Sequence, residues 1–253
     1  MLRTKLAALS PAAGAIFFVL AWWLLYASKL IDPVLLPSPQ DSFKAIWDGF
    51  VGGALINDFL ITVRRTLLAF VIAVAISVPL GIILGSSARL YGSVEFLIDF
   101  FRSTPASALF PLFLVILGVG EGTKIAVAAF GASLLILFNT AYGVMNARKT
   151  RQAAARVMGA SRLRVMFDVT LLESLPQTFV GMRTGVSFAL VIVIVAEMFI
   201  GSTDGLGQRV INAQMIFNMP EMYATIFGTG VLGYGLNLLF ILIERKFVHW
   251  GGK

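Results

Sequence analysis

Cysteine is absent from this chain, and histidine occurs only once among its 253 residues. The absence of cysteine excludes disulfides, thiolate catalysis and zinc sites built on sulfur. A single histidine, His249, cannot form a multi-histidine metal site or supply a serine triad with its usual partners. The clustered His, Asp, Glu or Cys side chains of a membrane-embedded enzyme are missing as well. We therefore predict that the chain is not an enzyme and that it binds neither a metal nor a cofactor.

Charged residues are also scarce. They make up 13% of the chain, whereas apolar residues make up 58%, and a soluble domain usually carries about 25% charged residues. So much apolar surface indicates that lipid is the natural solvent. The net charge of +7 does not indicate nucleic-acid binding, because the basic residues lie between long apolar runs. Lys and Arg in such positions are typical of the cytoplasmic side of membrane proteins, where they meet anionic lipid.

Six apolar stretches are long enough to cross a bilayer, which requires about 20 residues of helix. They are Ala12 to Ser28, Thr66 to Ala88, Ser103 to Gly120, Ile125 to Ala147, Thr184 to Ser202, and Met222 to Ile243. Segments of about ten residues with alternating polarity, typical of barrel strands, are not visible. The sequence therefore predicts an all-α integral membrane protein with six transmembrane helices.

The distribution of Lys and Arg predicts the orientation. Six basic residues fall between Arg148 and Arg164, and the positive-inside tendency places them in the cytoplasm. Both termini then lie in the cytoplasm as well. Arg64 and Arg65 fall at the outer end of the second span, where we expect their side chains to reach the lipid headgroups.

The segment from Arg151 to Arg183 is too polar to cross lipid, yet it is regularly patterned. Gln152 to Met158 contains good helix formers, Gly159 can adopt the left-handed conformation that ends a helix, and Ser161 can cap the next helix. That helix has Leu163, Met166, Phe167 and Thr170 at helical spacing. We expect a short helix, a glycine turn and an amphipathic helix on the cytoplasmic surface. As helices alone, they also fit an ordinary interfacial pair.

The residues of this segment resemble the "EAA" loop of the permeases of ABC importers. The similar positions are Ala153-Ala154, Gly159-Ala160, Phe167, Val169, Leu171, Leu175-Pro176 and Gly181. Other strings resemble the nitrate, sulfonate, taurine and bicarbonate branch: Leu36 to Pro39, Arg102 to Pro105, Gly118 to Gly120, Ala196 to Met198, and Gly205 to Gly207. The chain departs from the pattern at Ala153, which replaces the usual glutamate, and at Leu172, which replaces a proline.

This resemblance implies a type I importer fold, with one N-terminal helix and a five-helix permease core in a single domain over residues 1–253. It implies that residues 151–177 form a cytoplasmic coupling loop. The coupling residues would be Gln152, Ala153, Ala154, Arg156, Gly159, Ala160, Ser161, Leu163 and Phe167. The implied partners are cytoplasmic ATP-binding subunits, a second permease copy and a periplasmic or lipid-anchored solute-binding protein. The implied location is the bacterial inner membrane.

ATP and magnesium are expected on a partner subunit, because the chain lacks the G-x-x-x-x-G-K-[ST] phosphate loop. The segment from Gly118 to Lys124 contains glycines and a lysine but lacks the required ending. The resemblance implies the membrane-spanning subunit of an ABC importer for a small solute, such as the oxyanions sulfonate, nitrate or bicarbonate. The alternative is a secondary transporter or channel, which would need several buried charges or an inverted repeat.

Three residues are candidates for the solute path. Glu197 is the only ionisable residue well inside an apolar span; it can line the path, orient backbone at a gate, pair with a basic group or lie near the outer interface. Asn139 can contact solute or bond a neighbouring helix. Arg183 can attract an anionic solute, or bind lipid headgroups or the loop.

Two pairs of glycines have the G-x-x-x-G spacing that lets helices approach closely. They are Gly81 with Gly85 and Gly181 with Gly185. Such pairs serve either dimerisation or packing within one chain, and the sequence leaves both readings open.

Overall fold

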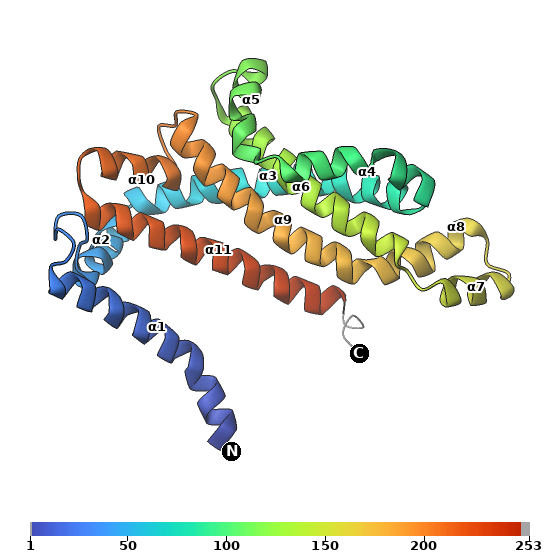
Figure 1. Cartoon of the computed structure of the whole chain (residues 1–253), viewed down its shortest axis with the longest axis horizontal. Helices are drawn as coiled ribbons and strands as arrows, with labels where there is room; N and C mark the ends of the chain where they lie inside the picture. The colour runs from blue at the N-terminus through green and yellow to red at the C-terminus, as the bar shows by residue number, and fades with distance from the viewer. Residues whose placement is uncertain (1, 249–253) are drawn as a thin grey trace.

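The computed structural model describes the backbone of residues 2–248 and the side chains of residues 13–248. The side chains of Arg3 and Lys5, as well as His249, lie outside these residues. Every regular element in the described part is a helix (Figure 1). The elements are α1 (Leu2–Ser28), α2 (Pro39–Val51), α3 (Ala54–Gly85), α4 (Ala88–Ser103), η1 (Ala106–Leu109), α5 (Phe110–Leu117), α6 (Glu121–Met145), α7 (Lys149–Val157), α8 (Arg162–Val165), η2 (Met166–Thr170), α9 (Leu171–Phe199), α10 (Leu206–Met215) and α11 (Met219–Phe247).

The core forms where α3 and α9 pack on α6, and small residues set the close approach. A Cβ added to Gly85 of α3 would lie 2.6 Å from the carbonyl oxygen of Ala141. A Cβ added to Gly185 of α9 would lie 2.7 Å from Cγ1 of Ile136. Gly81 and Gly181 also face α6. Both G-x-x-x-G pairs therefore pack within this chain, which is one of the two expected uses.

Four helical segments are long and apolar enough to cross a membrane: Ala54–Gly85, Glu121–Met145, Arg162–Phe199 and Met219–Phe247. They contain most of the second, fourth, fifth and sixth predicted spans. The first predicted span falls in α1, which diverges from the bundle toward the N-terminus (Figure 1). Near its other end, Trp22 donates a 3.1 Å hydrogen bond to the carbonyl of Pro37 and stacks on Tyr223 and Phe227 of α11.

The apolar stretch predicted as a span from Ser103 to Gly120 forms the second part of a bent pair of helices. The segments Ala88–Ser103 and Ala106–Leu117 meet at an angle of 92°. Pro105 explains the break locally, because it has no N–H and disfavours helical backbone at Thr104. Tertiary packing fixes it: Ala106 lies against Gly131, near the middle of α6. The helix before the break, α4, thus lies along the C-terminal half of α6.

The amphipathic helix predicted after Ser161 does not stand apart from the fifth predicted span. Both belong to Arg162–Phe199, which is one continuous helical segment. A widened π turn at Met166–Thr170 joins its two parts, and Pro176 lies inside the helix. The predicted features at its start are present: Gly159 has φ +87°, and the Ser161 hydroxyl accepts a hydrogen bond from the N–H of Arg164.

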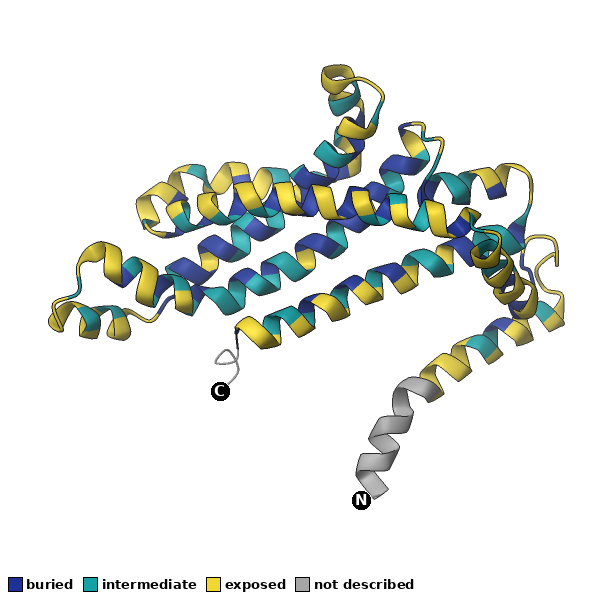
Figure 2. Ribbon diagram, turned by 180° about the vertical axis from the view of Figure 1, so that it is seen from behind, coloured by how far each residue is buried: buried dark blue, intermediate teal, exposed yellow. Residues whose placement is uncertain are grey.

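Burial follows this arrangement (Figure 2). Buried residues gather where α3, α6 and α9 face one another, whereas α7 has no buried residue. The short helix α2 precedes this bundle in the chain, and the Ser38 side chain caps its N-terminus.

Candidate functional site

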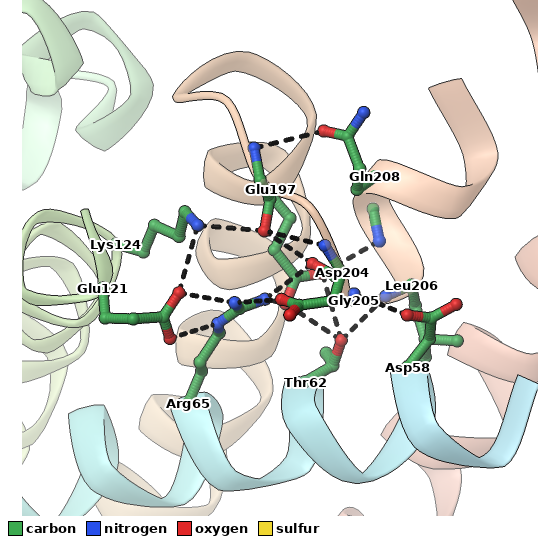
Figure 3. Close-up of polar contacts among 12 residues, drawn as sticks. Asp58, Thr62, Arg65, Glu121, Lys124, Glu197, Asp204, Gly205, Leu206 and Gln208 are labelled. Carbon is green, nitrogen blue, oxygen red and sulfur yellow. Dashed lines mark hydrogen bonds and ion pairs between the residues drawn. The ribbon is translucent and has the colours of Figure 1, made fainter. Parts of the chain in front are cut away.

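An ion-paired cluster joins α3, α6 and α9 at the end of the bundle where α9 meets α10 (Figure 3). Its central residue is Arg65, whose guanidinium lies 2.7 Å from Glu197, 2.5 Å from Glu121 and 2.7 Å from Asp204. Three carboxylates on separate segments therefore share one buried cation. Such a charge is stable away from water only when it is paired and hydrogen-bonded, as it is here.

Glu197 is fully buried, and its carboxylate is surrounded by donors. Besides Arg65, the Thr62 hydroxyl donates to it at 3.0 Å, and the backbone N–H of Gly207 donates at 2.9 Å. Thr62 in turn accepts a 2.9 Å bond from the N–H of Leu206. This carboxylate therefore holds the start of α10 against α3 and α9.

Two glycines make this approach possible. Gly205 has φ +106°, and a Cβ there would lie 2.5 Å from the Glu197 carboxylate and 2.6 Å from the Arg65 guanidinium. A Cβ on Gly207 would overlap the carbonyl oxygen of Ile194. The string Gly205-Leu206-Gly207 is thus explained by contact with the ion pair.

The expectation that Arg65 reaches the headgroups is wrong, because its side chain is only 3% exposed. Arg64, its neighbour, is exposed. One signal in the sequence points toward the pairing: Glu197 lies inside an apolar span and requires a cationic partner. The identity of that partner depends on a contact across 132 residues of chain. Among the roles considered for Glu197, the structure shows the ion pair with a basic residue, Arg65. A role of Glu197 on the solute path stays a prediction.

The two other path candidates lie on α6 and α9. Asn139 accepts a 2.7 Å hydrogen bond from the Gln177 amide and donates to the carbonyl of Leu135 at 2.8 Å. Arg183 lies 3.7 Å from Glu244 of α11. Neither contacts Glu197, so the structure does not bring the three candidates into one site.

The predicted coupling residues lie in short helices that protrude from one end of the bundle, α7, α8 and η2 (Figure 1). A turn at Gly159 joins α7 to α8 as a helix pair, and apolar side chains are exposed at the end of α7, in the turn, on α8 and on the adjoining η2. Val157 is 89% exposed, Met158 84%, Leu163 72% and Phe167 62%. The pair is tied to α9 by Glu173, which binds the N–H of Arg148 at 2.5 Å and the Arg151 side chain at 2.8 Å.

The surfaces of α3 and α4 differ in polarity. All exposed residues of α3 from position 67 to 83 are apolar: Leu67, Leu68, Val71, Ile72, Ala75, Ile76, Pro79, Leu80 and Ile83. By contrast, α4 exposes the polar residues Glu95, Asp99, Arg102 and Ser103 as well as large apolar residues such as Phe96, Leu97 and Phe100. The predicted third span began at Ser103, so Glu95, Asp99 and Arg102 were not expected beside the apolar helices; Arg102 was named only as part of a string shared with the family.

Comparison with known proteins gives a family and relatives of nearly the same length. The family described as "Binding-protein-dependent transport system inner membrane component" matches residues 77–249. A Brucella melitensis protein named "Probable ABC transporter permease protein" is 32% identical over 229 residues, which cover 90% of this chain and 92% of the relative. The taurine transport system permease protein TauC of Escherichia coli is 28% identical, covering 92% of this chain and 86% of TauC. The nitrate import permease protein NrtB of Leptolyngbya laminosa is 26% identical, with coverages of 94% and 87%.

Solved structures share the fold. A chain of the MetNI methionine ABC transporter, in an inward-facing conformation, matches with a TM-score of 0.68 at 22% sequence identity. The match covers 77% of this chain and 96% of that chain. A chain from an amino acid ABC transporter crystallised with histidines matches with a TM-score of 0.59.

Proposed function

Since this chain belongs to the binding-protein-dependent transport system inner membrane components, we propose that its cytoplasmic helix pair docks on an ATP-binding subunit and couples ATP hydrolysis to solute import. The chain is the permease subunit of an ABC importer, and ATP hydrolysis belongs to a separate subunit of the transporter. The proposal concerns which surface receives the ATPase, what the solute is, and how the subunit is assembled and oriented.

One observation supports the docking surface: Val157, Met158, Leu163 and Phe167 are exposed together on a structured helix pair. Exposed apolar side chains gathered on one surface indicate a protein interface. Basic residues beside them, Arg156 and Arg162, add charge to its rim. The Glu173 contacts give this surface a fixed position relative to α9.

The continuous helix from Arg162 to Phe199 supports the coupling step. A displacement of α8 by a docked ATPase moves α9 with it, because both belong to one helical segment. The far end of that segment carries Glu197, which is bonded to α3 and to the start of α10. The docked helix pair therefore acts as a lever between the cytoplasmic ATPase and the outer cluster.

For the solute, we propose a small oxyanion such as a sulfonate, nitrate or bicarbonate. The proposal is supported by relatives named for taurine, aliphatic sulfonates and nitrate. The solute-binding protein that delivers it would approach the outer side, where α2 and α10 lie (Figure 1).

We also propose a homodimer with both termini in the cytoplasm. In this orientation α7 and α8, with their Lys and Arg residues, face the ATPase, in accordance with the positive-inside tendency. Lipid covers the apolar outer surface of α3. A secondary transporter is the less favoured alternative, because it would leave the exposed apolar helix pair without an ATPase to bind.

The test is purification of the tagged chain in mild detergent, with identification and assay of the bound ATPase. Phe167→Asp should reduce the amount of co-purified ATPase at least tenfold, because it places a charge in an apolar interface. Val119→Asp is the matched control: Val119 is 76% exposed, but it lies between α5 and α6 at the outer side. Equal ATPase recovery with both variants would contradict the docking surface. Solute uptake into vesicles that contain the chain but no ATPase would contradict the importer.

A further inference from the structure

Helix α4 brings charged side chains into the inner half of the membrane span. Arg102 lies over the ring of Phe138, with 4.0 Å between its guanidinium carbon and the ring centroid. The preceding residue, Phe101, packs edge-on against Phe130 at 5.6 Å. Because Phe130 and Phe138 lie around the middle of α6, which spans residues 121–145, Arg102 is at membrane depth.

Charge at this depth is costly if it meets lipid. Placing Arg or Asp at the centre of a membrane helix costs about 2.5–3.5 kcal/mol on insertion scales. Yet Asp99 and Arg102 are both exposed on the surface of the single chain. The exposed residues of α3, which do suit lipid, are all apolar. The charged side of α4 must therefore face water or protein.

The helix break directly follows Arg102. Irregular backbone at membrane depth is tolerated only where it is covered by protein or lines a water-filled cavity. Thr104 and Pro105 form this break, and Ser103, Pro105 and Ser107 are exposed around it. Broken helices at this depth are where transporters place contacts with solute.

We propose that the break at residues 102–107 lines the solute path and that the Arg102 guanidinium contacts the oxyanion group of the passing solute. This inference rests on the proposed function and adds a contact residue to it. A guanidinium has five N–H donors and suits planar or tetrahedral oxyanions. In the described part of the chain, its hydrogen bond is to Asp99 at 3.0 Å, which leaves donors available.

Asp99 makes the contact weak enough for transport. It pairs with Arg102 and offsets its charge, so that an oxyanion is attracted without being held tightly. A path requires this balance, because a solute must leave the site as readily as it enters. The hydroxyls of Ser103 and Thr104 donate to carbonyls of their own helix, at 2.8 and 2.9 Å. The guanidinium is thus the principal donor of the site.

The absence of native cysteine gives a direct test in the intact transporter reconstituted in lipid vesicles. Ser103→Cys is treated with two thiosulfonate reagents, one bearing a sulfonate and one bearing a quaternary ammonium. We expect modification by both, with the sulfonate reagent favoured. Adding Arg102→Gln to Ser103→Cys should lower the ratio of the modification rate by the sulfonate reagent to that by the ammonium reagent about tenfold. Tenfold is the smallest rate effect expected of electrostatic focusing in a charged cleft. The sulfonate of the reagent serves as the oxyanion probe.

Leu80→Cys is the matched control, because Leu80 is exposed on the apolar surface of α3. Its neighbour Gly81 faces Leu137 and Thr140 of α6, so Leu80 lies at about the same depth as Arg102, which covers Phe138. It should remain unmodified in lipid. If Ser103→Cys fails to assemble, Ser107→Cys at the other side of the break replaces it. Assembly is measured by the amount of co-purified ATPase. Failure of the unmodified transporter to retain the ATPase would contradict the proposed function rather than the path site. Two results would overturn the path site: both break positions as unreactive as Leu80→Cys, or a rate ratio unchanged by Arg102→Gln.

Discussion

Arg65 of α3 and Glu197 of α9 form a 2.7 Å ion pair in which the two side chains are 3% and 0% exposed. They lie 132 residues apart in the chain. Glu121 and Asp204 also bind the same guanidinium. The outer ends of the three core helices are therefore held together by one buried cation and its acidic partners.

Replacing the cation should destabilise the fold strongly. Arg65→Met leaves buried Glu197 without its counter-ion, which costs about 3–5 kcal/mol when one partner of a buried pair is removed. The measurement is the free energy of unfolding in mixed micelles. Arg64→Met, at the exposed neighbouring position, should stay within about 0.5 kcal/mol of the native chain. Similar losses for the two variants would show that the pair is not a structural anchor.

Gly207 should not tolerate even one methyl group. In Gly207→Ala, the new Cβ would overlap the Ile194 carbonyl and approach Cβ of Glu197 to 2.8 Å. Overpacking of this kind costs about 1–3 kcal/mol. Gly228→Ala is the control, since a Cβ there meets nothing within 4 Å and alanine favours helix. The measurement is the thermal unfolding temperature of both variants. An unfolding temperature of Gly207→Ala as high as that of Gly228→Ala would contradict the close contact between α10 and α9.

The turn at Gly159 predicts a difference between two substitutions. Its φ of +87° is disfavoured for residues with a Cβ, by about 1–2 kcal/mol, but asparagine tolerates this region better than valine. We expect Gly159→Val to impair ATPase binding and solute uptake, with membrane insertion intact. Gly159→Asn should retain more of both activities. Normal uptake by the valine variant would rule out the lever role of the helix pair.

The Asn139–Gln177 hydrogen bond can be separated from a role on the path by a double-mutant cycle. Their 2.7 Å contact joins α6 to α9. Such bonds within membranes contribute about 0.6 kcal/mol on average and at most about 1.7 kcal/mol. We expect alanine substitutions to show coupling of that size in unfolding, with little change in uptake. Uptake that falls sharply without a change in stability would instead place Asn139 on the solute path.

Much of the fold is predictable because its signals are local. Apolar length identifies the helices α3, α6, α9 and α11, and Gly159 and Ser161 locate the turn between α7 and α8. Each of these depends on a few neighbouring residues, such as a serine that can cap the N–H three positions later.

The features that escaped prediction depend on distant partners. Pro105 allows a break, but the 92° bend also reflects the packing of Ala106 on Gly131. Arg65 appears free to reach the headgroups until Glu121 and Asp204 are brought beside it by folding. The continuity of the fifth predicted span with the helix that begins at Arg162 was not foreseen either, because polarity alone set the predicted beginning.

The continuous helix from Arg162 to Phe199 has a thermodynamic consequence. Its 38 residues extend about 57 Å at the usual rise, from the Gly159 turn to the cluster around Glu197. If the two ends move as one body, ligands that act on them are linked, and their effects on affinity are reciprocal. If binding of the outer partner strengthens binding of the ATPase by a given factor, then bound ATPase strengthens binding of the outer partner by the same factor. The outer loop would therefore report on the nucleotide state of a protein on the other side of the membrane.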